Sequence, residues 1–92
     1  MRVNYHGSEE ILTSVAGENI IPEGGENWTY SPIRFKDFAF MNTTDCTVRV
    51  NEGKPIFLKA NQGFQYMGND KNYIDSFIIV ESGIEYQFIG RY

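Results

Sequence analysis

The sequence predicts an all-β, mainly antiparallel fold: a small β-sandwich, jelly-roll-like, or an open barrel, with an irregular N-terminal segment. Short runs rich in β-branched and aromatic residues recur from residue 27 onward, and clusters of Gly, Asn, Asp and Pro separate them. No amphipathic stretch of helical length lies between the runs, which disfavours a parallel βαβ arrangement. The 92 residues are 41% hydrophobic and 15% aromatic, which suffices for one core. We therefore expect a single domain over residues 1–92.

The N-terminal segment differs in composition from the rest of the chain. Residues 1–30 hold five of the twelve acidic residues and a single basic residue, Arg2. Residues 8–15 fit either a short helix capped by Ser8 or a strand over residues 11–15. A loop follows from Pro22, because proline and glycine favour turns. We expect residues 1–26 to form an arm or an irregular opening of the domain.

Residues 33–40 alternate in two phases. Ile33 and Phe35 occupy odd positions, whereas Phe38 and Phe40 occupy even positions. Successive side chains of a strand point to opposite faces, so a regular strand would not bring both pairs to one core. A β-bulge at residues 36–37 would place both halves on the same face.

The clearest local unit is a hairpin over residues 46–59. Cys46, Val48 and Val50 alternate with polar residues and so share one face of a strand. Residues 51–54 have the polar, glycine-containing composition of a hairpin connection, and residues 55–59 form the returning strand.

Further strands are predicted over residues 64–67, 73–80 and 84–88. The run Phe77–Val80 is apolar at every position. This is expected of a central strand covered on each side, or of a strand whose outer face meets another subunit.

The large apolar side chains exceed what one row of inward positions needs, although most of them should fill the core. Phe57 points opposite Ile56 and Leu58, so part of a second apolar face should be covered by a second sheet or by another subunit. The residues expected at a subunit interface are Phe57, Phe77, Ile79 and Tyr92. An alternative to a subunit interface is a site where aromatic rings in loops stack on the faces of sugars. The candidate residues for such stacking are Trp28, Tyr30, Tyr66 and Tyr73.

No catalytic, cofactor-binding or metal site can be assembled from the sequence. His6 is the only histidine, and a general base or metal ligand normally needs a positioned second group. Cys46 is the only cysteine and shares a strand face with Val48, which favours a buried side chain over a nucleophile. The sequence also lacks a phosphate-binding glycine loop. We expect no enzyme activity, no cofactor and no metal.

Charge and hydropathy exclude two partner classes. The formal net charge is −4, and the eight basic residues are scattered rather than gathered in a stripe, so nucleic acid is not an expected partner. No apolar run approaches the roughly 20 residues that span a bilayer, so no membrane is expected. A single cysteine forms no intrachain disulfide and is typical of the reducing cytoplasm.

The second half of the chain resembles small accessory structural proteins from the virions of tailed bacteriophages. The resemblance covers residues 48–92, and it is carried by Val50–Leu58, Ala60–Phe64, Ile74–Tyr86 and Ile89–Gly90. It implies a jelly-roll-like or related sandwich that forms homo-oligomers and contacts other virion proteins on a capsid, tail or fibre. The implied location is the virion, assembled in the host cytoplasm.

Three functions therefore remain for experiment to separate. The preferred one is a non-enzymatic structural protein that assembles with itself and other virion proteins. A carbohydrate or small-ligand binding module is the first alternative, and glycan screening would test it. A phage-encoded inhibitor that binds a host protein through an acidic surface is the second, and a pull-down from host lysate would test it.

Overall fold

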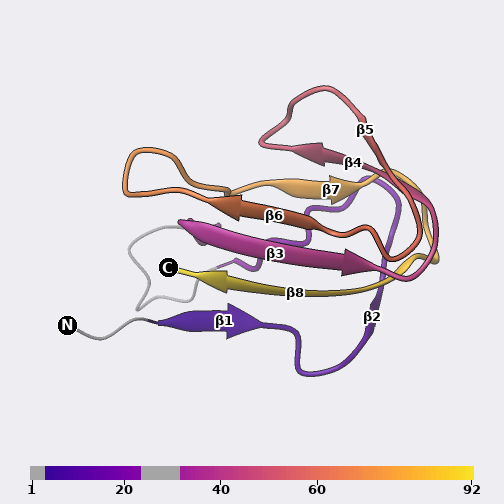
Figure 1. Ribbon diagram of the computed structural model, residues 1–92, viewed down its shortest axis with the longest axis horizontal. Coiled ribbons are helices and arrows are strands. Elements are labelled where there is room, and N and C mark those ends of the chain that lie inside the picture. The colour runs from indigo at the N-terminus through magenta and orange to yellow at the C-terminus, as the bar shows by residue number, and fades with distance from the viewer. Residues whose placement is uncertain (1–3, 24–31) are drawn as a thin grey trace.

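The computed structural model describes residues 4–23 and 32–92, and every regular element in them is a β-strand (Figure 1). The strands are β1 (Tyr5–Gly7), β2 (Leu12–Thr13), β3 (Asp37–Asn42), β4 (Cys46–Val50), β5 (Ile56–Leu58), β6 (Phe64–Met67), β7 (Phe77–Ile79) and β8 (Glu85–Arg91). All of their pairings are antiparallel. The predicted all-β, mainly antiparallel fold is confirmed.

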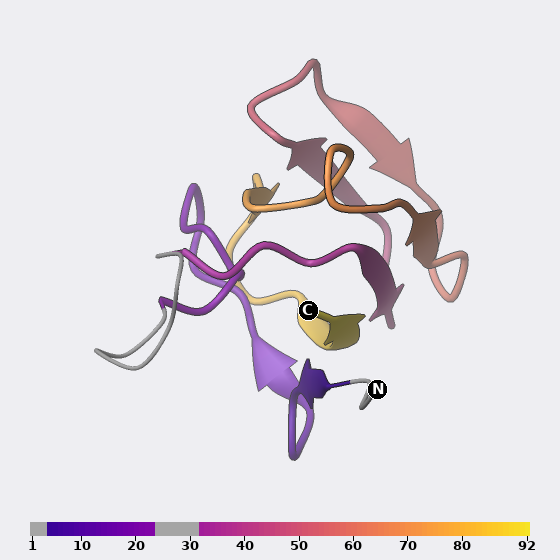
Figure 2. The same ribbon diagram turned by 90° about the vertical axis from the view of Figure 1, so that its left-hand side faces the viewer.

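The strands form two sheets that together make an open sandwich. The larger sheet has the order β1-β8-β3-β6, with β2 also paired to β8, and the smaller sheet has the order β5-β4-β7. Figure 2 shows the layers from the side, with β5 and β6 on the same side of the molecule. Among the described strands, β5 and β6 are therefore edge strands that lie on one side of the sandwich.

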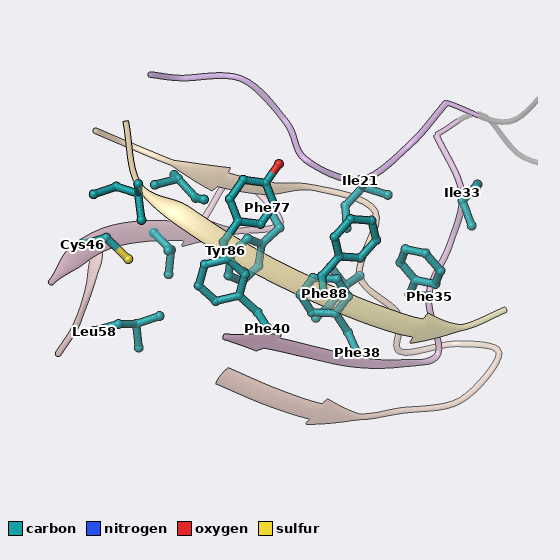
Figure 3. Close-up of a cluster of buried hydrophobic side chains, with 14 residues drawn as sticks. Ile21, Ile33, Phe35, Phe38, Phe40, Cys46, Leu58, Phe77, Tyr86 and Phe88 are labelled. Atoms are coloured by element: carbon teal, nitrogen blue, oxygen red, sulfur yellow. The ribbon is translucent and has the colours of Figure 1, made fainter. Parts of the chain in front are cut away.

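An aromatic cluster fills the space between the sheets (Figure 3). Phe77 lies at its centre, with its ring centroid 4.7 Å from that of Phe40, 5.1 Å from that of Phe38 and 5.6 Å from that of Phe64. Tilted rings at these separations are favourable because the positive edge of one ring meets the negative face of another.

The structure corrects two predicted interface residues. Phe77 and Ile79 are both 0% exposed, and they belong to the core of their own chain. The outward positions on the same stretch belong to Ile78, which is half-buried, and Val80, which is exposed. The sequence is apolar in both phases here, so alternation alone did not reveal which pair faces inward.

The predicted change of phase near residues 36–37 is confirmed, because Ile33, Phe35, Phe38 and Phe40 are all buried. The backbone N–H of Lys36 donates to Arg91 O at 2.7 Å, whereas its carbonyl accepts from Gly68 N–H at 2.7 Å. In a regular antiparallel strand both groups of one residue point to the same neighbour. Lys36 therefore interrupts the regular ladder, and Phe35 pairs instead with Ile74.

The predicted hairpin is also confirmed. Cys46 pairs with Leu58 and Val48 pairs with Ile56, in the register expected from residues 46–59. Asn51 and Glu52 adopt positive φ angles of 49° and 61° in the connection, a conformation that turn residues such as Asn tolerate.

The N-terminal segment is attached to both sheets. Of the two predictions for residues 8–15, the strand is the one observed, as β2. Beyond it, Gly17 N–H donates to Ile79 O at 3.2 Å and Ile20 N–H donates to Phe77 O at 2.9 Å. Asn19 forms an isolated antiparallel bridge with Ile78. Residues 17–20 thus cover the edge of β7 that faces away from β4, which satisfies backbone groups that would otherwise form an open edge.

Candidate interaction surfaces

The outer face of the larger sheet is a grid of side chains set by strand register. One row crosses the sheet through Tyr5, Arg91, Asp37 and Met67. The next row crosses it through Gly7, Ile89, Ala39 and Gln65. In a third row, Gln87 lies opposite Met41. These positions alternate with the buried side chains of the same strands, so the grid faces away from the core.

Two adjoining hollows mark this face. The larger has a volume of about 580 Å³ and lies over the second and third rows. The smaller has a volume of about 290 Å³ and lies over the first and second rows. Ala39, Gln65 and Ile89 line both hollows, which are therefore two parts of one shallow groove.

Small residues create this depression. Ala39 stands in the middle of the sheet between Ile89 and Gln65, where a larger side chain would fill the groove. Gly63 adopts a φ of +70°, and a Cβ atom there would lie 2.7 Å from Phe40 O. Both the conformation and the close approach of the backbone require glycine at this position.

The charged groups beside the groove are paired within the chain. The carboxylate of Asp37 accepts a hydrogen bond from Arg91 Nε at 2.5 Å, and this bond holds the pKa of Asp37 below its ordinary value. Asp70 forms an ion pair with Lys36 at 2.7 Å, which likewise lowers the pKa of Asp70. These groups add little net charge to the surface around the groove.

A second surface is the open edge, which we define as Ile56 and Phe57 of β5. Both side chains are exposed, with Phe57 at 59%, whereas the exposed side chain of Met67 belongs to the outer face of the larger sheet. Single exposed apolar residues are common on proteins, but two adjacent ones on an edge strand are typical of a contact surface.

The backbone of Phe57 also points toward the open edge. Its partner Thr47 donates its N–H to Glu81 Oε1 at 2.8 Å and accepts from Val80 N–H at 2.9 Å. Both groups of Thr47 are thus directed away from β5. Because hydrogen-bonded and non-hydrogen-bonded pairs alternate in antiparallel sheets, the N–H and C=O of Phe57 are directed away from β4.

The outer face of the smaller sheet continues from Phe57. Thr47 lies beside Phe57, and Arg49 pairs with Ile78. With Val80 also exposed, this face mixes apolar side chains with polar ones.

The residues predicted to stack on sugars do not form a common shelf in the described part of the chain. Tyr66 is half-buried and packs against the core from β6. Tyr73 lies beneath the guanidinium of Arg34, at 4.6 Å from the ring centroid. Trp28 and Tyr30 lie outside the described residues.

The other predicted interface residues have different positions. Phe57 is exposed at the open edge, as described above. Tyr92 is half-buried, packs against the core, and donates its N–H to Asn4 O at 3.0 Å. Met67 and Val80 were not singled out from the sequence, and their exposure follows from strand register and edge position.

Cys46 and His6, the single cysteine and the single histidine of the sequence, both pack against other side chains of the fold. Cys46 is 1% exposed, and burial raises the pKa of its thiol to about 11. The His6 ring lies 6.4 Å from the rings of Phe35 and Phe88, centroid to centroid. Within residues 4–23 and 32–92, no three His, Cys, Asp or Glu side chains are grouped closely enough to hold a metal ion.

The comparisons with known proteins give no match. No known protein family, no curated protein and no solved structure matches this chain. The described residues include no helix that is long and apolar enough to cross a membrane.

Proposed function

We propose that this chain is a non-enzymatic structural protein that assembles with copies of itself through the open edge. The observation that carries the proposal is the exposure of Ile56 and Phe57 on β5, an edge strand of the smaller sheet. Burying such side chains against a second copy removes apolar surface from water, which is the main driving force of association.

The backbone of β5 supports the same contact. A second copy of β5 can lie antiparallel to the first, with the two Phe57 residues opposite each other across a two-fold axis. Each Phe57 would then donate its N–H to the carbonyl of the other, in the manner of strand addition at a sheet edge. The two smaller sheets would become one continuous sheet.

The flanks of β5 limit the contact to a closed assembly. Pro55 precedes the strand and lacks a backbone donor, and Lys54 and Lys59 place charges at its two ends. Proteins use these features to prevent unlimited edge pairing. Only the three residues of β5 remain for pairing, which favours a discrete oligomer over a growing fibre.

The resemblance of the second half of the chain supports a place for this assembly in a virion. Residues 48–92 resemble accessory virion proteins of tailed bacteriophages, and this segment contains the strand of the open edge. We therefore propose that the oligomer is a component of a phage capsid, tail or fibre, and that other virion proteins are its further partners.

Light scattering coupled to gel filtration tests self-assembly across a wide range of protein concentrations. We expect a defined oligomer for the unchanged protein and a shift toward monomer for Phe57→Ser. Val15→Ser is the matched control, because Val15 is 60% exposed but lies in the N-terminal segment, away from the open edge. A protein that stays monomeric at millimolar concentration would contradict the proposal.

A further inference from the structure

We propose that the groove on the outer face of the larger sheet is a binding site for a neutral oligosaccharide. The groove faces away from the core and involves none of the apolar side chains of β5. Met67 borders only the smaller hollow. This site is therefore separate from the self-assembly contact proposed above and can be tested on its own.

Charge is the first argument. The larger hollow is lined by eleven residues, and none has an ionisable side chain: Ser8, Ala39, Phe40, Met41, Gln62, Gly63, Phe64, Gln65, Gln87, Phe88 and Ile89. The protein as a whole has a net charge of −4. A phosphorylated, sulfated or cationic ligand would find no opposite charge in this hollow, whereas a neutral ligand loses no ionic hydration on entering it.

The polar groups match hydroxyl groups. Gln62, Gln65 and Gln87 each present a side-chain amide, which both donates and accepts hydrogen bonds, as a sugar hydroxyl does. Gln62 Oε1 accepts a hydrogen bond from Lys59 N–H at 2.9 Å, which fixes the orientation of this amide. Its NH₂ group is thereby left as the donor on one wall of the groove.

The floor of the groove is apolar. Ala39 lies between Ile89 and Gln65 in one row, and Met41 lies beside Gln87 in the next. Sugars have apolar C–H faces as well as hydroxyl edges, so a floor of aliphatic side chains with amides around it matches both parts of such a ligand. A volume of about 580 Å³ falls within the usual range for ligand pockets.

The shape favours a chain of sugar units. The larger hollow continues across Ala39 into the smaller one, where the exposed ring of Tyr5 stands at the far side. Tyr5 thus provides an aromatic surface for stacking that the sequence analysis did not single out. Residues from β1, β8, β3 and β6 all contribute to the groove, so the ligand would lie across the sheet.

Backbone amide chemical shifts of the ¹⁵N-labelled protein are the appropriate readout. The probes are neutral hexasaccharides: maltohexaose, cellohexaose, xylohexaose and chitohexaose. We expect at least one to produce saturable shifts at Ala39, Gln65 and Ile89. A heparin-derived hexasaccharide, which is highly anionic, should leave these signals unchanged.

Variants at outward positions test the site without altering the core. Ala39→Phe should fill the groove and abolish the saturable shifts. Gln65→Ala and Gln87→Ala should each weaken binding by about twofold to tenfold, the effect of one hydrogen bond. Glu85→Ala is the control, because Glu85 is on the same strand as Gln87 but does not line either hollow.

Two outcomes would overturn the proposal. One is the absence of saturable shifts with all four neutral probes in a protein whose spectrum shows a folded domain. The other is a set of groove signals that move with protein concentration instead of with sugar, because a second copy would then occupy the groove. Self-assembly through the open edge would remain testable by Phe57→Ser in either case.

Discussion

The side-chain oxygen of Asn19 accepts hydrogen bonds from the backbone N–H groups of Phe77, at 2.9 Å, and Ile21, at 3.1 Å. Its amide nitrogen donates to Asp75 O at 3.2 Å. One polar side chain therefore joins the N-terminal segment to the strand at the centre of the core. This connection adds to the packing of Leu12, Ile20 and Ile21 in holding the N-terminal segment to the rest of the fold.

Replacing Asn19 with alanine should lower the free energy of unfolding by roughly 1–3 kcal/mol, because two backbone donors lose their acceptor. Urea denaturation measures the loss, and faster hydrogen exchange at Phe77 and Ile21 would locate it. Asn72→Ala is the control: Asn72 is exposed, and its substitution should change stability by less than about 0.5 kcal/mol. Equal stabilities of the two variants would contradict this role for Asn19.

Asn42 should be more sensitive, since it is 0% exposed. Its side chain donates to Thr44 O at 2.8 Å and Lys59 O at 2.9 Å, and it accepts from Gly63 N–H at 2.9 Å. Asn42→Ala leaves these backbone groups unpaired, and we expect a loss of about 2–4 kcal/mol in thermal or urea unfolding. A loss below about 1 kcal/mol would show that water replaces the amide.

The thiol of Cys46 should react slowly in the folded protein. Burial raises its pKa from 9.0 to about 11, which reduces the thiolate fraction at pH 8 by about a hundredfold. Its 1% exposure slows attack further. Mass spectrometry after iodoacetamide treatment should therefore show alkylation at least about a hundredfold slower than in urea. Comparable rates in the two states would mean that the β4–β5 hairpin opens readily.

The pair formed by Asp37 and Arg91 should contribute to acid sensitivity. The hydrogen bond from Arg91 lowers the pKa of Asp37 in the folded state. A carboxyl group with a lowered pKa stabilises the fold above its unfolded pKa, and this contribution is lost as pH falls through the folded pKa. The free energy of unfolding should thus decline below about pH 4.

Two substitutions separate this contribution from that of other carboxyl groups. Asp37→Asn and Arg91→Gln should each make the decline shallower, because each removes one partner of the same pair. Urea denaturation at a series of pH values between about 2 and 6 would give the slope of the free energy of unfolding against pH. This slope reports how many more protons the unfolded state binds than the folded state. Identical slopes for the variants and the unchanged protein would contradict a role for the pair.

The sequence predicted the fold class and the β4–β5 hairpin because both depend on local patterns. Alternation of Cys46, Val48 and Val50 and the turn at residues 51–54 are sufficient to define a hairpin. The change of phase at residues 36–37 was predictable for the same reason. The phase changes because Phe35 pairs with Ile74, whereas the residues from Asp37 onward pair with β8. These partners are distant in the sequence, so no local pattern indicates them.

The surfaces were harder to predict. Phe77 and Ile79 were placed at an interface, yet Ile78 and Val80 are the outward pair, because an entirely apolar strand contains no alternation to read. The groove depends on which residues lie opposite one another across strands, such as Ala39 beside Ile89 and Gln65. Register of this kind arises from tertiary pairing and not from the order of residues along one strand.

The position of β8 has a consequence for how the protein is made. β8 includes residues near the end of the described chain, yet it pairs with β1, β2 and β3 at the centre of the larger sheet. During translation, β1 and β3 therefore emerge from the ribosome with no partner between them until β8 has been synthesised. The hairpin of β4 and β5 can form earlier, whereas the larger sheet, and with it the groove, must form after synthesis of β8.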